Sequence, residues 1–295
     1  MAYLTDKLGH ITGFNTLFTS ANPSNHSSHI PGSVVRKKPR ADLSSLYLGL
    51  PLIAAFLVLW EIAPRLGWLN AIFFPPFSEV LVALRDLAVA GTLGTHILAS
   101  LQRAAAGFAL AVVVAIPLGF LMGRYSRFEK CADLLVQTLR NTSQFALLPV
   151  FILLLGIGEA SKIAITFYAS VFFLLINTIT GVKAVDPLLV KAARSMGTSD
   201  LDMFRKVILP ASIPSIVAGA RLGVKSSVVA VIGAEMLAAK SGLGYLIQNS
   251  QLMMQTADMY AGILTLTLMG LAINYLLVWF EKRATSWKSQ SNTGF

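Results

Sequence analysis

The residues best placed to do chemistry in this sequence are charged groups inside long apolar stretches. Arg221 and Lys225 stand four residues apart, which puts them on one face of a helix. Glu235 comes fourteen residues after Arg221 and returns to within about 40° of that face at roughly 100° per residue. Such a stripe could line a cavity that binds an anion. Alternatively, its charges could snorkel to a membrane surface or hold neighbouring helices together.

A second polar group interrupts another apolar stretch. Residues 140–144 read Arg-Asn-Thr-Ser-Gln and precede Pro149. A polar break of this kind is tolerated in a membrane only where it faces protein or water. Two interpretations remain open: Asn141 and Gln144 line a pathway together with Lys225, or they pack against neighbouring helices.

Motifs for catalysis or metal binding are absent from the sequence. There is no HExxH or GxSxG motif and no paired His and Cys ligands. Gly242-Leu-Gly244 lacks the lysine and the preceding strand of a phosphate-binding loop, so we predict a turn there. The single cysteine, Cys131, excludes an internal disulfide. We therefore predict no catalytic residue, no metal site, no cofactor and no enzyme activity in this chain.

The composition is that of an integral membrane protein. Of the 295 residues, 55% are hydrophobic and 13% are charged, whereas soluble domains carry about 25% charge. A spanning helix needs about 20 mostly apolar residues. The sequence predicts an all-α protein with six transmembrane helices, at Leu46–Ala63, Leu101–Met122, Cys131–Ile157, Ile163–Val182, Ile213–Ala238 and Met259–Phe280.

The distribution of Lys and Arg predicts the orientation in the membrane, because cytoplasmic loops are enriched in both residues. Six spans put both termini on one side. On that side lie sixteen basic residues, namely Lys7, Arg36, Lys37, Lys38, Arg40, Arg124, Arg127, Lys130, Lys183, Lys191, Arg194, Arg205, Lys206, Lys282, Arg283 and Lys288. The opposite side holds five, namely Arg65, Arg85, Arg103, Lys162 and Lys240. We predict that both termini are cytosolic, and the net charge of +10 then needs no nucleic-acid partner.

The chain divides into a membrane domain and two tails. Residues 1–42 are polar, end in a basic run and lack the features of a cleavable signal peptide, so we expect a disordered cytosolic tail. Residues 43–283 form the membrane domain, and residues 284–295 form a cytosolic C-terminal tail. Between the first two spans we expect an external helix, capped by Ser78 and apolar at Val80, Leu81, Leu84 and Leu87, that packs on the bundle or at the interface.

The cytosolic loop at residues 184–210 is more elaborate than a simple turn. Asp186 is a good N-cap, Pro187 suits the first helical position, and Gly197 suits the position after a helix ends at Met196. Ser199 then starts a second helix, which Leu209-Pro210 closes at the membrane. The loop is either a docking surface for a soluble partner or an ordinary connection of two amphipathic helices.

The spacing within this loop resembles a known family. Ala192-Ala193, three residues, Gly197, nine residues and Val207-Ile208-Leu209-Pro210 resemble the EAA loop of ABC importer permeases, whose pattern is E-A-A, three residues, G, nine residues, I-x-L-P. Lys191 stands where the family often has Glu. The stretches FPPFSEVLVAL, LLPVFILLLGIGEASK, GVKAVDPLLVKAARSMGTS and GAEMLAAKSGLGYLI, within Phe74 to Arg283, look like the nitrate, sulfonate and taurine branch. RNTSQFALLP departs from that branch's proline-rich segment.

The resemblance implies a type I ABC importer permease fold in a bacterial cytoplasmic (inner) membrane. Two copies of the permease would form the pathway, two cytosolic ATP-binding subunits would power it, and an external or periplasmic binding protein would deliver the solute. Lys191, Ala192, Ala193, Gly197, Leu209 and Pro210 would couple the permease to the ATPase, with Ala192 and Ala193 allowing close packing. Asn141, Gln144, Arg221, Lys225 and Glu235 are the candidate pathway residues.

Alternatives remain for both mechanism and solute. A secondary transporter would show repeats and buried acids for ion coupling, and we find no convincing repeat and few such acids. A membrane-embedded enzyme lacks a catalytic constellation. The branch and the cationic stripe favour an aliphatic sulfonate, taurine or nitrate. The alternative is a neutral or heterocyclic solute such as a thiamine-precursor pyrimidine.

Overall fold

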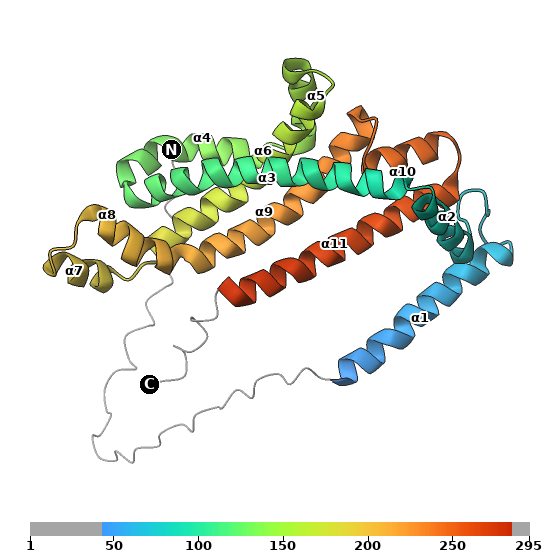
Figure 1. Ribbon diagram of the computed structural model, residues 1–295, viewed down its shortest axis with the longest axis horizontal. Coiled ribbons are helices and arrows are strands. Elements are labelled where there is room, and N and C mark those ends of the chain that lie inside the picture. Colours follow the sequence, from blue (N-terminus) through green and yellow to red (C-terminus); the bar gives the residue numbers. More distant parts are fainter. Residues whose placement is uncertain (1–42, 285–295) are drawn as a thin grey trace, which may run out of the picture. The chain divides into compact units, whose positions relative to one another are not determined.

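The computed structural model describes residues 43–284, and every regular element in this range is helical (Figure 1). The predicted N-terminal tail and residues 285–295 of the predicted C-terminal tail lie outside the described residues. The contacts divide the chain after Pro51, and the packing below belongs to the unit that begins at Leu52. The longer helices are α1 (Leu43–Arg65), α2 (Phe77–Val89), α3 (Thr92–Arg124), α4 (Ser126–Asn141), α5 (Gln144–Leu155), α6 (Glu159–Lys183), α9 (Leu209–Ala238), α10 (Leu243–Leu252) and α11 (Thr256–Ala284).

Four helices of the described part are long and apolar enough to cross a membrane: α3, α6, the continuous helix at 200–238 and α11. They contain the second, fourth, fifth and sixth predicted spans. The third predicted span is broken, because α4 and α5 meet at an angle of 98° at the polar run that starts with Arg140. Counting this bent pair gives up to five crossings. Helix α1 covers the first predicted segment, and its crossing stays a prediction.

The core is formed by α3, α6 and α9, which run side by side (Figure 1). Glycines allow the close approach: a Cβ atom on Gly107 would lie 2.5 Å from Thr166 Cβ, and one on Gly119 would lie 2.6 Å from Thr178 Cβ. The constant offset between these pairs makes α3 and α6 parallel. Gly219 of α9 contacts Asn177 of α6 in the same way. Small residues at helix interfaces are a feature of membrane bundles, where packing rather than water exclusion drives association.

The parallel arrangement of α3 and α6 dictates the path of the chain between them. Both helices begin at the same end of the bundle, since Arg103 in the first half of α3 bonds Glu159, the first residue of α6. The chain must therefore return along the bundle after Arg124. Helices α4 and α5 connect the end of α3 to the start of α6, and this bent pair counts as at most one crossing.

Helix α2 packs against α11 through buried Val80 and Ala83, which contact Ala261. This confirms the predicted packing on the bundle, but the predicted cap is wrong. The N-cap position is Pro76, and Ser78 lies in the first turn. The Ser78 N–H instead donates to Glu61 of α1 at 2.9 Å, so a neighbouring helix satisfies it.

The 184–210 loop folds as two short helices, as predicted. Helix α7 (Pro187–Ser195) starts at Asp186, whose side chain accepts from the Leu188 N–H, and helix α8 (Asp200–Met203) starts at Ser199, which caps the Asp202 N–H. Gly197 has φ +73°, and the Thr198 N–H donates to Ala193 O in a Schellman motif.

The predicted end of the second helix at Leu209-Pro210 is wrong. Helix α8 continues through a π-helical turn, η1 (Phe204–Ile208), into α9, whose first turn contains Pro210. The helix is continuous across Pro210, and a local π-helical turn is one way in which a membrane helix accommodates the backbone groups that a proline leaves without a partner.

Candidate functional site

A cavity of about 550 Å³ opens beside the break between α4 and α5. Its walls come from the middle of α6, from α9 and from the two sides of the break. The lining residues are Arg140, Thr142, Gln144, Tyr168, Ala169, Phe172, Phe173, Ile176, Asn177 and Ser226. Arg140 is the one charged residue among them. The cavity therefore lies between the α4–α5 break and one side of α6 and α9.

Aromatic rings and one hydrogen bond shape this cavity. The Tyr168 and Phe172 rings meet edge to face with centroids 5.2 Å apart, and Phe151 of α5 contacts Tyr168. The Tyr168 hydroxyl donates to the carbonyl of Leu139, in the last turn of α4. Helix α6 thereby holds the end of α4 beside the cavity, next to Arg140.

The structure separates the five predicted pathway residues. Gln144 lines the cavity. Asn141 ends α4 and is exposed, and Lys225 is exposed on α9 beside the lining residue Ser226. Arg221 pairs with Glu281 of α11 at 2.8 Å, so its side chain points to another helix.

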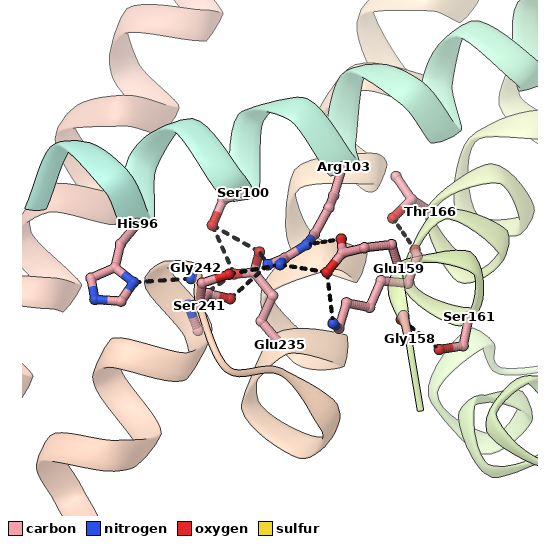
Figure 2. Close-up of polar contacts among 12 residues, drawn as sticks. His96, Ser100, Arg103, Gly158, Glu159, Ser161, Thr166, Glu235, Ser241 and Gly242 are labelled. Atoms are coloured by element: carbon pink, nitrogen blue, oxygen red, sulfur yellow. Dashed lines mark hydrogen bonds and ion pairs between the residues drawn. The ribbon is translucent and has the colours of Figure 1, made fainter. Parts of the chain in front are cut away.

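Glu235, in the last turn of α9, belongs to a buried polar network (Figure 2). Its fully buried carboxylate accepts from Arg103 Nη1 at 2.7 Å and from Ser100 Oγ at 2.7 Å. Arg103 also binds Glu159 with Nε at 2.5 Å and Nη2 at 2.9 Å. Lys162 pairs with Glu159 at 3.2 Å. Two cations and two carboxylates thus balance, and they join α3, α6 and α9.

The same network holds the turn between α9 and α10. Arg103 donates to the backbone carbonyl of Ser241 at 2.6 Å, and the Gly244 N–H donates to Glu235 at 3.0 Å. A Cβ atom on Gly242 would meet the Glu235 carboxylate, and one on Gly244 would meet the Ile232 carbonyl. The two glycines of the predicted turn are therefore required by the close approach of the backbone to Glu235.

Sequence reasoning missed the role of Arg103. It counted Arg103 among the residues on the external side. In the structure this side chain of α3 is buried against Glu159 of α6 and Glu235 of α9, with 6% of its area exposed. The available signal was an arginine close to the start of an apolar run, where a buried partner is expected. The identity of the partner could not be inferred, because Glu235 lies 132 residues away.

The two alanines of the 184–210 loop point in different directions. Ala193 is 4% exposed and packs with Val185, Met203 and Ile208 of the same chain. Ala192 and Lys191 are exposed, as are the apolar side chains of Leu188, Leu189 and Met196. The exposed side of α7 therefore carries apolar side chains and Ala192 beside the charged Lys191 and Arg194, while Ala193 fixes α7 to the rest of the loop.

Comparison with known sequences identifies relatives over most of the chain. An aliphatic sulfonates transport permease of Bacillus subtilis is 31% identical over 86% of this chain and 92% of its own length. The taurine transport permease of Escherichia coli is 30% identical over 86% of this chain and 95% of its length. The nitrate import permease of Leptolyngbya laminosa is 31% identical over 64% of this chain and 67% of its length.

Structural comparison agrees on the fold. The MetNI methionine ABC transporter in an inward-facing conformation matches with a TM-score of 0.60 at 16% identity, covering 67% of this chain and 98% of the transporter chain. Residues 115–286 match the family of binding-protein-dependent transport system inner membrane components. This range contains the broken span, the cavity-lining residues of α6 and α9, and the two-helix loop. The chain therefore belongs to this family, as the multi-pass inner-membrane permease subunit of an ABC importer.

Proposed function

We propose that this chain forms the translocation pathway for small oxyanions: aliphatic sulfonates, taurine or nitrate. The observation that carries the proposal is the cavity between the α4–α5 break, α6 and α9, which has one arginine in its lining. The sulfonate, taurine and nitrate permeases among the relatives support the same solute class. They do not favour the neutral pyrimidine alternative.

Family membership implies the other subunits of the transporter. Importers of this family use separate ATP-binding subunits and a solute-binding protein, so ATP hydrolysis does not belong to this chain. Membership of this family also argues against the alternative of a secondary transporter.

Two copies of the chain enclose the complete pathway in this proposal. Lys225 is exposed on α9 between the exposed side chains of Leu222 and Val229. A lysine in the middle of a spanning helix is costly against lipid and normally faces protein or water. This face of α9 therefore turns toward a second copy, with Asn141, Gln144 and Lys225 along the pathway. Arg221 and Glu235 act instead in helix pairing.

The 184–210 loop transmits the ATPase cycle in this proposal. The exposed Lys191 and Ala192, with the apolar side chains beside them, contact the ATP-binding subunit on the cytosolic side. The buried Ala193, together with Gly197 and the Leu209-Pro210 pair, sets the position and direction of α7.

Reconstitution tests the proposed function. The permease is incorporated into liposomes with its ATP-binding subunit and binding protein, and uptake of taurine, ethanesulfonate, nitrate and a neutral aminopyrimidine is measured. We expect uptake of at least one anion that needs both ATP and the binding protein. Uptake of the pyrimidine without any of the anions would exclude the proposed solute class.

A further inference from the structure

Arg140 is a cation in the last turn of α4, at the α4–α5 break, and it has no counter-ion in the described part of the chain. Arg140 takes part in none of the ion pairs found among the described residues, such as those of Arg65, Arg103 and Arg221. The other arginines inside the bundle are paired, as Arg103 and Arg221 show. An unpaired charge within a membrane domain is expensive and by default marks a pathway or a ligand site. The unsatisfied group faces the cavity, because Arg140 is one of its lining residues.

Further hydrogen-bonding groups are available around the same cavity. Helix α5 begins at the break, and its N-cap, Ser143, makes no side-chain hydrogen bond to the first turn. Thr142 and Gln144, on either side of Ser143, both line the cavity. The first N–H groups of a helix attract anions, and broken helices supply such groups to solute sites in the membrane. No hydrogen bond within the described residues occupies the Gln144 amide or the Ser226 hydroxyl.

The remaining walls suit an anion that carries a short organic chain. Tyr168, Phe172 and Phe173 present aromatic surface on the α6 side. The hydrogen bond of Tyr168 to the carbonyl of Leu139 holds the last turn of α4, which includes Arg140, beside this surface. A guanidinium matches the oxygens of a sulfonate or nitrate because two parallel N–H donors can bind two oxygens.

We infer that Arg140 is the anion-binding and charge-selecting group of the pathway, and that it binds the oxyanion head of the solute as it passes the α4–α5 break. The inference rests on the proposed function and deepens it. The sequence analysis considered Arg221 and Lys225 of α9 as the cations of a pathway, whereas the charged residue that lines the cavity is Arg140 of α4.

The test measures uptake and ATP hydrolysis together in the full reconstituted complex, with Arg140→Gln, Arg140→Lys and the control Arg127→Gln. Arg127 is an exposed arginine in the first turn of α4, away from the cavity. Removal of a charge-assisted bidentate contact should lower the maximal uptake rate of taurine or ethanesulfonate by about tenfold or more. The solute concentration at half-maximal rate should stay unchanged, because the binding protein sets it.

The variants separate binding from folding. Arg140→Gln should keep ATP hydrolysis stimulated by the binding protein, so the ratio of uptake to hydrolysis falls. Arg140→Lys should recover part of the uptake because it keeps the charge, and Arg127→Gln should match the wild type. Equal uptake by Arg140→Gln and wild type would overturn the inference, as would a parallel loss of uptake and hydrolysis in both Arg140 variants. A wild-type complex that imports none of the anions would instead refute the proposed function.

A lipid phosphate could bind the same guanidinium, and the liposome composition distinguishes the two sources. Uptake is measured in liposomes of phosphatidylcholine alone and in liposomes that also contain phosphatidylglycerol. We expect the same loss for Arg140→Gln in both. A loss confined to the anionic liposomes would assign Arg140 to a lipid headgroup and overturn the inference.

Discussion

Replacement of Arg103 by leucine should destabilise the permease more than replacement of any exposed arginine. The change removes the guanidinium that bonds Glu235, Glu159 and the backbone of Ser241. Leucine fills part of the space but leaves the Glu235 carboxylate buried without its cation. Ser100 and the Gly244 N–H remain as its only hydrogen-bond donors within the described residues.

The two carboxylates contribute unequally to the expected cost. The Glu235 side chain is 0% exposed, and removing one partner of a buried pair costs about 3–5 kcal/mol. The Glu159 side chain is 58% exposed and keeps Lys162, so its share is discounted to about 0–1 kcal/mol. We therefore expect Arg103→Leu to lower the free energy of unfolding by about 3–5 kcal/mol.

The double variant Arg103→Leu with Glu235→Gln shows whether the buried charge causes the loss. Glutamine at 235 is neutral and keeps an oxygen for Ser100 and Gly244, so about half or more of the lost stability should return. Unfolding is followed by the helical circular dichroism of the purified permease in mixed detergent and SDS micelles. Arg85→Leu, on the exposed face of α2, is the control and should change stability by about 0.5 kcal/mol or less. A cost below about 1 kcal/mol for Arg103→Leu, or a double variant no more stable than the single one, would refute the reasoning.

Three further predictions concern glycines and alanines. Gly107→Ala should lower the free energy of unfolding by about 1–3 kcal/mol, because the added Cβ meets α6 at 2.5 Å, whereas Gly270→Ala has nothing within 4 Å; equal effects in the micelle assay would contradict this packing. Gly197→Ala should cost about 1–2 kcal/mol from its φ of +73° and reduce uptake per ATP hydrolysed, and unchanged coupling would show that this conformation is not needed. Ala193→Leu should reduce the yield of folded permease. Ala192→Leu should keep the yield but reduce ATP hydrolysis stimulated by the binding protein, and the opposite order would argue against the assigned faces.

Sequence reasoning succeeded where the signal was local. The caps at Asp186 and Ser199 follow from residue type and spacing, because a capping side chain bonds a backbone N–H two or three residues away. The cap at Gly197 follows because glycine adopts the positive φ that ends a helix. The same reasoning failed at Ser78, because Glu61 on another helix supplies the acceptor. It also failed at Pro210, where a π-helical turn carries the helix past a proline that local rules treat as a stop.

The candidate site shows the same division. The polar run at 140–144 announced a break in the third span, since polar side chains and an uncapped backbone cannot face lipid. The direction in which the chain bends at this break could not be inferred from the sequence. The 98° bend and the positions of α6 and α9 decide that Arg140 and Gln144 line a cavity while Asn141 does not belong to the lining.

By itself the sequence determined the membrane class, the approximate helices and the capped loop, because each depends on composition or on neighbours within a few residues. Only the tertiary structure decided how the charges are used. Arg221 and Glu235 lie on nearly one face of the same helix, yet one pairs with α11 and the other with α3. The partner of a buried charge depends on which helix passes at that depth, and helix periodicity carries no information about the neighbouring helices.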